Sequence, residues 1–128
     1  MDIGDTFIAD APGTSIDSHL WMVISYPAKS HDVVIVNFTS YREDKDQACV
    51  VEKSEHPYLM KQSIVNYPAA KLVAVKQLEA LLDAGHMVDH EPLSNALLDK
   101  ILDCSSDSQI DMFLWDMLNE QELIPEDI

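Results

Sequence analysis

Two apolar runs separated by a short break constrain the fold of this chain more than any other feature. The first is "HLWMVISY" at residues 19–26 and the second is "DVVIVNF" at residues 32–38. Both are rich in Val, Ile and aromatic residues and do not alternate with polar ones, a pattern typical of central strands buried on both faces. The break "PAKSH" predicts a short hairpin-like connection, so we expect the two strands to pair as antiparallel neighbours.

Three further segments read as strands. They are "DTFIAD" at residues 5–10, "ACVVEK" at 48–53 and "KQSIVNY" at 61–67. Turn chemistry separates them: "APGTS" follows the first strand, and the charged "REDKD" precedes the fourth. About five short strands with short connections predict a small, strongly bent sheet or barrel.

The hydrophobic period changes after Pro68. Apolar residues then recur at helical spacing, with Pro68 suited to the first turn of a helix and Gly85 to its end. Two more helices are predicted at 93–103 and 106–121, the second opening with Ser106 and Gln109 at capping-box spacing. The apolar stripe of this last helix leaves Trp115 outside it and consists of Ile110, Phe113, Leu114, Met117 and Leu118. Strands followed by helices define an α+β fold.

The formal charge of −15 is distributed unevenly. Residues 1–76 contain ten acidic and seven basic residues, whereas residues 77–128 contain thirteen acidic residues and a single base, Lys100. We therefore expect a β unit at 1–76 and an acidic helical extension at 77–128, packed together as one compact domain. The acidic extension should repel nucleic acid and attract basic surfaces, unless it is simply a solvated helical face.

Several classes of protein are not expected. The first residues do not resemble a signal peptide, and no apolar run reaches the roughly 20 residues that span a membrane. Two cysteines without metal-ligand spacing favour a reduced, cytoplasmic protein. Nucleotide, protease and redox motifs are absent, so we expect no cofactor. His86 and His90 are four residues apart, but Gly85 and Pro92 mark an inter-helix loop, so we expect no metal site there.

Polar residues at the strand ends form the best candidate site. His19 opens the second strand, Thr39 and Ser40 close the third, and His56 and Lys61 flank the fifth. If the second and third strands are antiparallel, His19 lies close to the Thr39–Ser40 pair. The alternative interpretation is a surface histidine and ordinary turn residues.

The stretch "GDTFIADAPGTSIDSHLWMVISYPAKSHDVVIVNFTS", residues 4–40, resembles the opening of the MazF/PemK-like (also called CcdB/PemK-like) toxins. That family begins with Gly-Asp and a short strand, then an irregular loop, an apolar strand ending near Ser, and a second apolar strand ending in a pair such as Thr-Ser. The later "KQSIVNYPAAKLV" is similar to the family's final strand running into a helix. The resemblance covers residues 4–75 and does not extend to the acidic helices.

The resemblance implies an SH3-like barrel, often a homodimer, that cleaves single-stranded RNA without a metal as the toxin of a toxin–antitoxin system. Thr39 matches the family's threonine at the scissile phosphate. His19 stands where the family has arginine, and Leu20 follows where the family has proline. Losing the arginine removes a fixed charge that stabilises phosphate, whereas a histidine can act as general acid or base.

The catalytic hypothesis assigns proton transfer to His19 and His56. Thr39, Ser40 and Lys61 would then hold the phosphate, and Arg42 would contact substrate beside Lys61. Because the whole chain is acidic, RNA binding requires a local basic patch. Its candidate members are Lys29, Arg42, Lys45, Lys53, Lys61 and Lys71.

Two alternatives remain open at this point. One is a non-catalytic binding protein on the same barrel, whose acidic C-terminal helices dock a basic protein partner or cover the RNA path and autoinhibit. The other is an unrelated accessory protein in which the barrel is only a scaffold.

Overall fold

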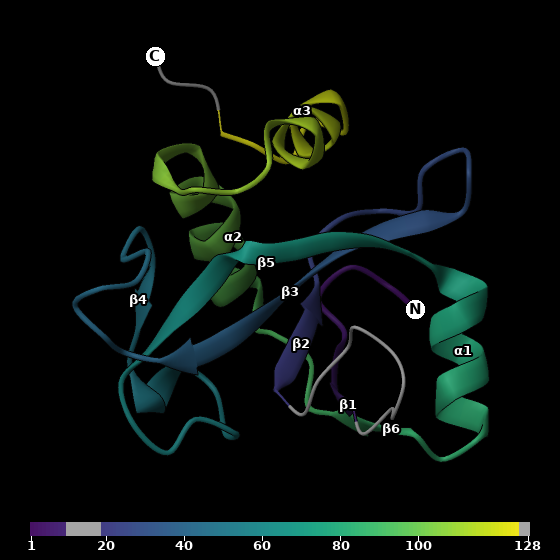
Figure 1. The fold of residues 1–128 in the computed structure, drawn as a ribbon, viewed down its shortest axis with the longest axis horizontal. Coiled ribbons are helices and arrows are strands. Elements are labelled where there is room, and N and C mark those ends of the chain that lie inside the picture. The colour runs from purple at the N-terminus through teal and green to yellow at the C-terminus, as the bar shows by residue number, and fades with distance from the viewer. Residues whose placement is uncertain (10–18, 126–128) are drawn as a thin grey trace.

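The computed structural model describes residues 1–9 and 19–125. The turn and irregular loop expected after the first strand fall within residues 10–18, outside this part of the chain. Six antiparallel strands form one sheet in the order β4-β5-β3-β2-β1-β6 (Figure 1). Their bounds are β1 (Thr6–Ala9), β2 (Leu20–Val23), β3 (Asp32–Ser40), β4 (Val50–Val51), β5 (Ser63–Ala74) and β6 (Met87–His90).

The central strands are buried on both faces, as their sequence predicts. All four residues of β2 are buried, and so are Val33–Phe38 of β3. One face packs beneath the helices α2 (Asn95–Cys104) and α3 (Met112–Glu120), while the other packs against α1 (Val75–Asp83). Figure 1 shows α2 and α3 gathered on one side of the sheet, with α1 at the far end of β5.

The α+β class is confirmed, but within residues 1–9 and 19–125 the sheet has six strands and is not closed into a barrel. In the described residues, β4 pairs only with β5, and β6 pairs only with β1. The additional strand is β6, where the sequence predicts an inter-helix loop. Its residues pair with β1 over Thr6–Ala9, which gives the segment after α1 a hydrogen-bonding partner that local sequence does not reveal.

The helix expected from Pro68 starts later. β5 continues through Pro68 to Ala74, and α1 begins at Val75. Pro68 has no N–H to donate, and it lies where the β3–β5 register shifts, between the pairs Ile35–Lys71 and Asn37–Asn66. A bulge is the place in a sheet where proline is tolerated. The predicted end of the helix is confirmed, because Gly85 has a φ of +79°.

α3 begins at a different residue from the one the capping pattern indicates. Its N-cap is Asp111, whose side chain accepts a hydrogen bond from the Phe113 N–H, and Ser106 lies in a preceding short 3₁₀ helix, Ser105–Asp107. The predicted apolar stripe is confirmed only in part. Leu114 and Leu118 are buried as expected, but Phe113 is exposed, and Trp115 packs against the core.

The compositional boundary near residue 76 falls inside α1, at its first turn. Beyond it, β6 completes the sheet, and α2 and α3 supply core side chains, among them Leu97, Ile101 and Leu118. The acidic segment therefore shares its core with the β unit. Within the described residues, no helix is both long and apolar enough to cross a membrane.

Candidate functional site

Four of the six residues singled out from the sequence line one pocket at the ends of β2 and β3. The pocket has a volume of about 350 Å³. Its walls come from the start of β2, the end of β3 and the loop that precedes β5. The lining residues are His19, Leu20, Phe38, Thr39, Ser40, Tyr58, Leu59, Met60 and Lys61.

Strand pairing explains how His19 reaches Thr39. β2 and β3 are antiparallel with Trp21 opposite Asn37 and Met22 opposite Val36. Continuing this register by two residues places His19 opposite Thr39, and both side chains are half-buried. Antiparallel pairing of β2 and β3 therefore places His19 close to Thr39, as predicted from the sequence.

The loop between β4 and β5 places Lys61 at the pocket. Ser63, at the start of β5, pairs with Ser40 across the sheet, and its hydroxyl donates to the Lys61 carbonyl oxygen at 3.0 Å. The Tyr41 N–H donates to the Gln62 carbonyl oxygen at 3.3 Å. These contacts fix the backbone carbonyls of Lys61 and Gln62 next to the end of β3.

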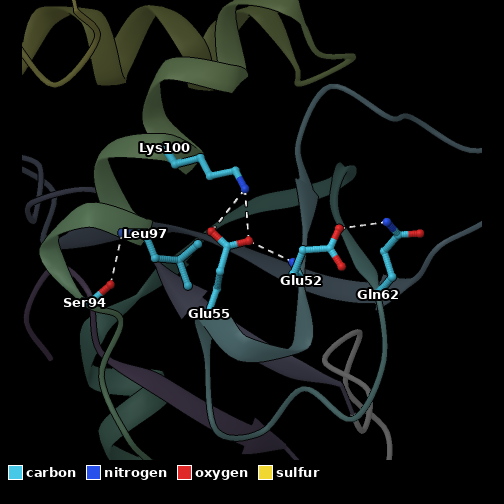
Figure 2. A network of polar contacts seen from close by, with 6 residues as sticks. All are labelled: Glu52, Glu55, Gln62, Ser94, Leu97 and Lys100. Carbon is cyan, nitrogen blue, oxygen red and sulfur yellow. Dashed lines mark hydrogen bonds and ion pairs between the residues drawn. The ribbon is translucent and has the colours of Figure 1, made fainter.

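A polar network holds the same loop to α2 (Figure 2). Lys100 of α2 donates to both carboxylate oxygens of Glu55, at 3.1 and 3.0 Å. Glu55 accepts from the Glu52 N–H at 2.8 Å, and the Glu52 side chain accepts from Gln62 at 2.9 Å. The only base of the acidic half is thus used to anchor the loop that carries Lys61.

His56 does not line the pocket, and its ring is bonded to backbone groups instead. It is 2% exposed. Its Nε2 lies 2.7 Å from the Glu91 carbonyl oxygen, and its Nδ1 accepts from the Tyr58 N–H at 3.1 Å. With Nδ1 as acceptor, the proton sits on Nε2 and is donated to Glu91. Because both ring nitrogens bond to backbone groups, His56 holds the loop at Tyr58 against Glu91, just after β6. His56 therefore positions this loop.

Arg42 also lies away from the pocket. Its guanidinium makes two hydrogen bonds of 3.1 Å to the Asp44 carboxylate, in an exposed pair. Lys71, another member of the expected basic patch, has its ammonium 4.6 Å from the centre of the Trp21 ring. Among the six candidate bases, only Lys61 lines the pocket.

Three residues near the pocket do not emerge from the sequence patterns. Tyr58 and Met60 line it, and Met60 is 86% exposed. Both residues follow Pro57 in an irregular segment without a strand pattern, so strand patterns in the sequence do not single them out. Asn37, two residues before Thr39, is 2% exposed, and its Oδ1 has no hydrogen-bond partner in the part of the chain that the structure describes. Its available signal is a polar residue after four consecutive apolar ones in the run "DVVIVNF".

The sequence does not predict a metal site at His86 and His90. Within residues 1–9 and 19–125, no group of three or more His, Cys, Asp or Glu side chains is arranged to hold a metal ion. His90 instead packs its ring against His56, with 5.6 Å between ring centres, and against Tyr58 at 5.4 Å. These contacts add to the hydrogen bonds that fix the loop.

Comparison with family models, curated proteins and solved structures gives no match to this chain. The resemblance to the MazF/PemK-like toxins therefore stays a prediction from the sequence.

Proposed function

We propose that the pocket at the ends of β2 and β3 binds single-stranded RNA and cleaves it. The observation that supports this most is the convergence of His19, Thr39, Ser40 and Lys61 on one pocket from three separate segments. An imidazole, two hydroxyls and an ammonium can supply the proton transfer and charge stabilisation that cleavage of a phosphodiester by its own 2′-hydroxyl needs.

In this mechanism, His19 takes the proton of the RNA 2′-hydroxyl as that oxygen attacks the phosphorus. The bond to the 5′-oxygen breaks, and the products are a 2′,3′-cyclic phosphate and a 5′-hydroxyl. Thr39 and Ser40 donate hydrogen bonds to the non-bridging oxygens. Lys61 balances the charge that develops on the phosphate, and its ammonium supplies the proton for the departing 5′-oxygen.

This assignment departs from the sequence hypothesis at two residues. His56 is left out because both ring nitrogens are engaged by backbone groups. Arg42 is left out because it pairs with Asp44. The proposal keeps the family-level expectations of a toxin of a toxin–antitoxin system that acts in the cytoplasm as a homodimer.

The direct test is incubation of the purified protein with a 5′-labelled pool of single-stranded RNA, with and without a chelator. We expect chelator-insensitive cleavage that leaves cyclic phosphate ends. Lys61→Met should weaken RNA binding, and Lys53→Met, the same change in the 3₁₀ helix Lys53–Glu55, serves as its control. Absence of cleavage by the wild-type protein at low salt would rule the proposal out.

The autoinhibited alternative receives no support from the geometry. All residues that line the pocket lie between His19 and Lys61, so the acidic helices do not occupy it. The other alternative, docking of a basic protein partner, concerns a different surface, which is formed by α3.

A further inference from the structure

A groove runs between α3 and the turn that joins β2 to β3. It has a volume of about 320 Å³. It shares no lining residue with the pocket of His19, so a role for one surface is independent of a role for the other. The groove is lined by Ala28, Ser30, Leu72, Phe113, Asp116, Met117 and Glu120.

The two walls of the groove are fixed to each other. The Gln121 side chain, at the end of α3, accepts from the Tyr26 N–H at 2.8 Å and donates to the Tyr26 carbonyl oxygen at 2.9 Å. The turn itself is closed by backbone bonds of 2.9 Å from Ala28 to Asp32 and from His31 to Ala28. The groove therefore exists before any ligand binds, which lowers the entropic cost of binding.

Phe113 is the most unusual residue on this surface. It is 68% exposed, whereas the other phenylalanines, Phe7 and Phe38, are 0% and 3% exposed. Leu72 of β5 and Met117 provide further apolar surface in the same groove. An exposed aromatic residue beside a preformed apolar groove is typical of an anchoring point for a partner.

The charge of the groove defines the chemistry of that partner. Asp116 and Glu120 follow Phe113 at i+3 and i+7, so the two carboxylates and the ring share one face of α3. Residues 101–125 contain no Lys or Arg. Lys29 is the one Lys or Arg in the turn opposite, so acidic groups prevail on this surface.

We propose that this groove docks an amphipathic, basic segment of a protein partner. An apolar side chain of the segment packs against Phe113, Leu72 and Met117, and its Lys or Arg side chains pair with Asp116 and Glu120. A second copy docked through this same groove is a poor occupant, because Asp116 and Glu120 of the two copies would face each other and like charges repel.

The test is selection of binders from a library of random peptides displayed on phage, followed by affinity measurement on the full-length chain by fluorescence anisotropy. We expect the selected peptides to carry net positive charge and apolar residues at helical spacing. Phe113→Ser should weaken their binding at least about tenfold, and the double change Asp116→Lys with Glu120→Lys should do the same.

Matched controls separate the groove from general charge and hydrophobicity. Met112 is 69% exposed on the same helix and does not line the groove, so Met112→Ser should leave affinity within about twofold. Asp99→Lys, at an exposed position of α2 that does not line the groove, should change the affinity far less than the two charge reversals in the groove. Neutral or acidic peptides, or peptides that bind Phe113→Ser as tightly as wild type, would overturn the proposal.

Sedimentation of the free protein provides an independent test. We expect Phe113→Ser to leave the oligomeric state unchanged, whatever that state is. A wild-type dimer that dissociates in Phe113→Ser would assign the groove to a second copy of the chain and contradict the docking of a basic partner.

Discussion

The buried ring of His56 offers the sharpest test of how the loop at the pocket is held. Substituting His56→Ala removes the bonds to the Glu91 carbonyl oxygen (2.7 Å) and to the Tyr58 N–H (3.1 Å). Each bond contributes about 1 kcal/mol, and the cavity left by the ring adds about 1 kcal/mol more. We therefore expect the free energy of unfolding to fall by about 3 kcal/mol, measured by urea denaturation. His86→Ala, at an exposed histidine, should change it by less than about 0.5 kcal/mol.

A second donor makes the prediction more specific. The Thr6 hydroxyl also donates to the Glu91 carbonyl oxygen, at 2.7 Å. Either single substitution, His56→Ala or Thr6→Val, leaves that carbonyl with one donor, but the double substitution removes both. The combined loss should therefore exceed the sum of the single losses by about 1 kcal/mol. Strict additivity, or a cost below about 0.5 kcal/mol for His56→Ala alone, would refute a structural role for His56.

Three further predictions concern the rest of the fold. Burial alone would raise the Glu55 pKa, but the Glu52 N–H and Lys100 together lower it below 4.5. Lys100→Met should therefore cost about 0.5–1 kcal/mol at pH 7, in urea titrations, and less as the pH falls through the lowered pKa. Asp111→Ala should destabilise the protein by about 1 kcal/mol through loss of the α3 cap, while Ser106→Ala should be nearly neutral. Burial is the main cause that raises the pKa of Cys49 to about 12. Iodoacetamide at pH 8 should therefore label this thiol only when the protein unfolds, which peptide mass mapping measures.

The elements with strong local patterns could be predicted from the sequence. β2 and β3 carry continuous apolar runs, and their antiparallel pairing follows from the short connection. The errors occur where a distant partner decides the structure. Local rules place a helix start at Pro68, yet pairing with β3 extends β5 past it. The segment Met87–His90 carries no strand signal of its own and becomes β6 only because β1 offers an unpaired edge.

The pocket could be predicted in part for the same reason. His19 and Thr39 are brought together by strand register, which is a local consequence of one hairpin. His56 is a candidate because it precedes the fifth strand, and Arg42 because it is a base, but neither criterion reveals which groups are already bonded. The loop network that includes Lys100 and Glu55 spans 45 residues of sequence, so no pattern within a window could have shown it.

We propose that His19 performs proton transfer in an RNA-cleaving pocket. Its test is the rate of cleavage of a 5′-labelled single-stranded RNA by wild type, His19→Ala and His86→Ala, purified in parallel. We expect His19→Ala to be slower by about 100-fold or more, and His86→Ala to match wild type. Equal rates for His19→Ala and wild type would contradict the assignment of His19 and, with it, the proposed site.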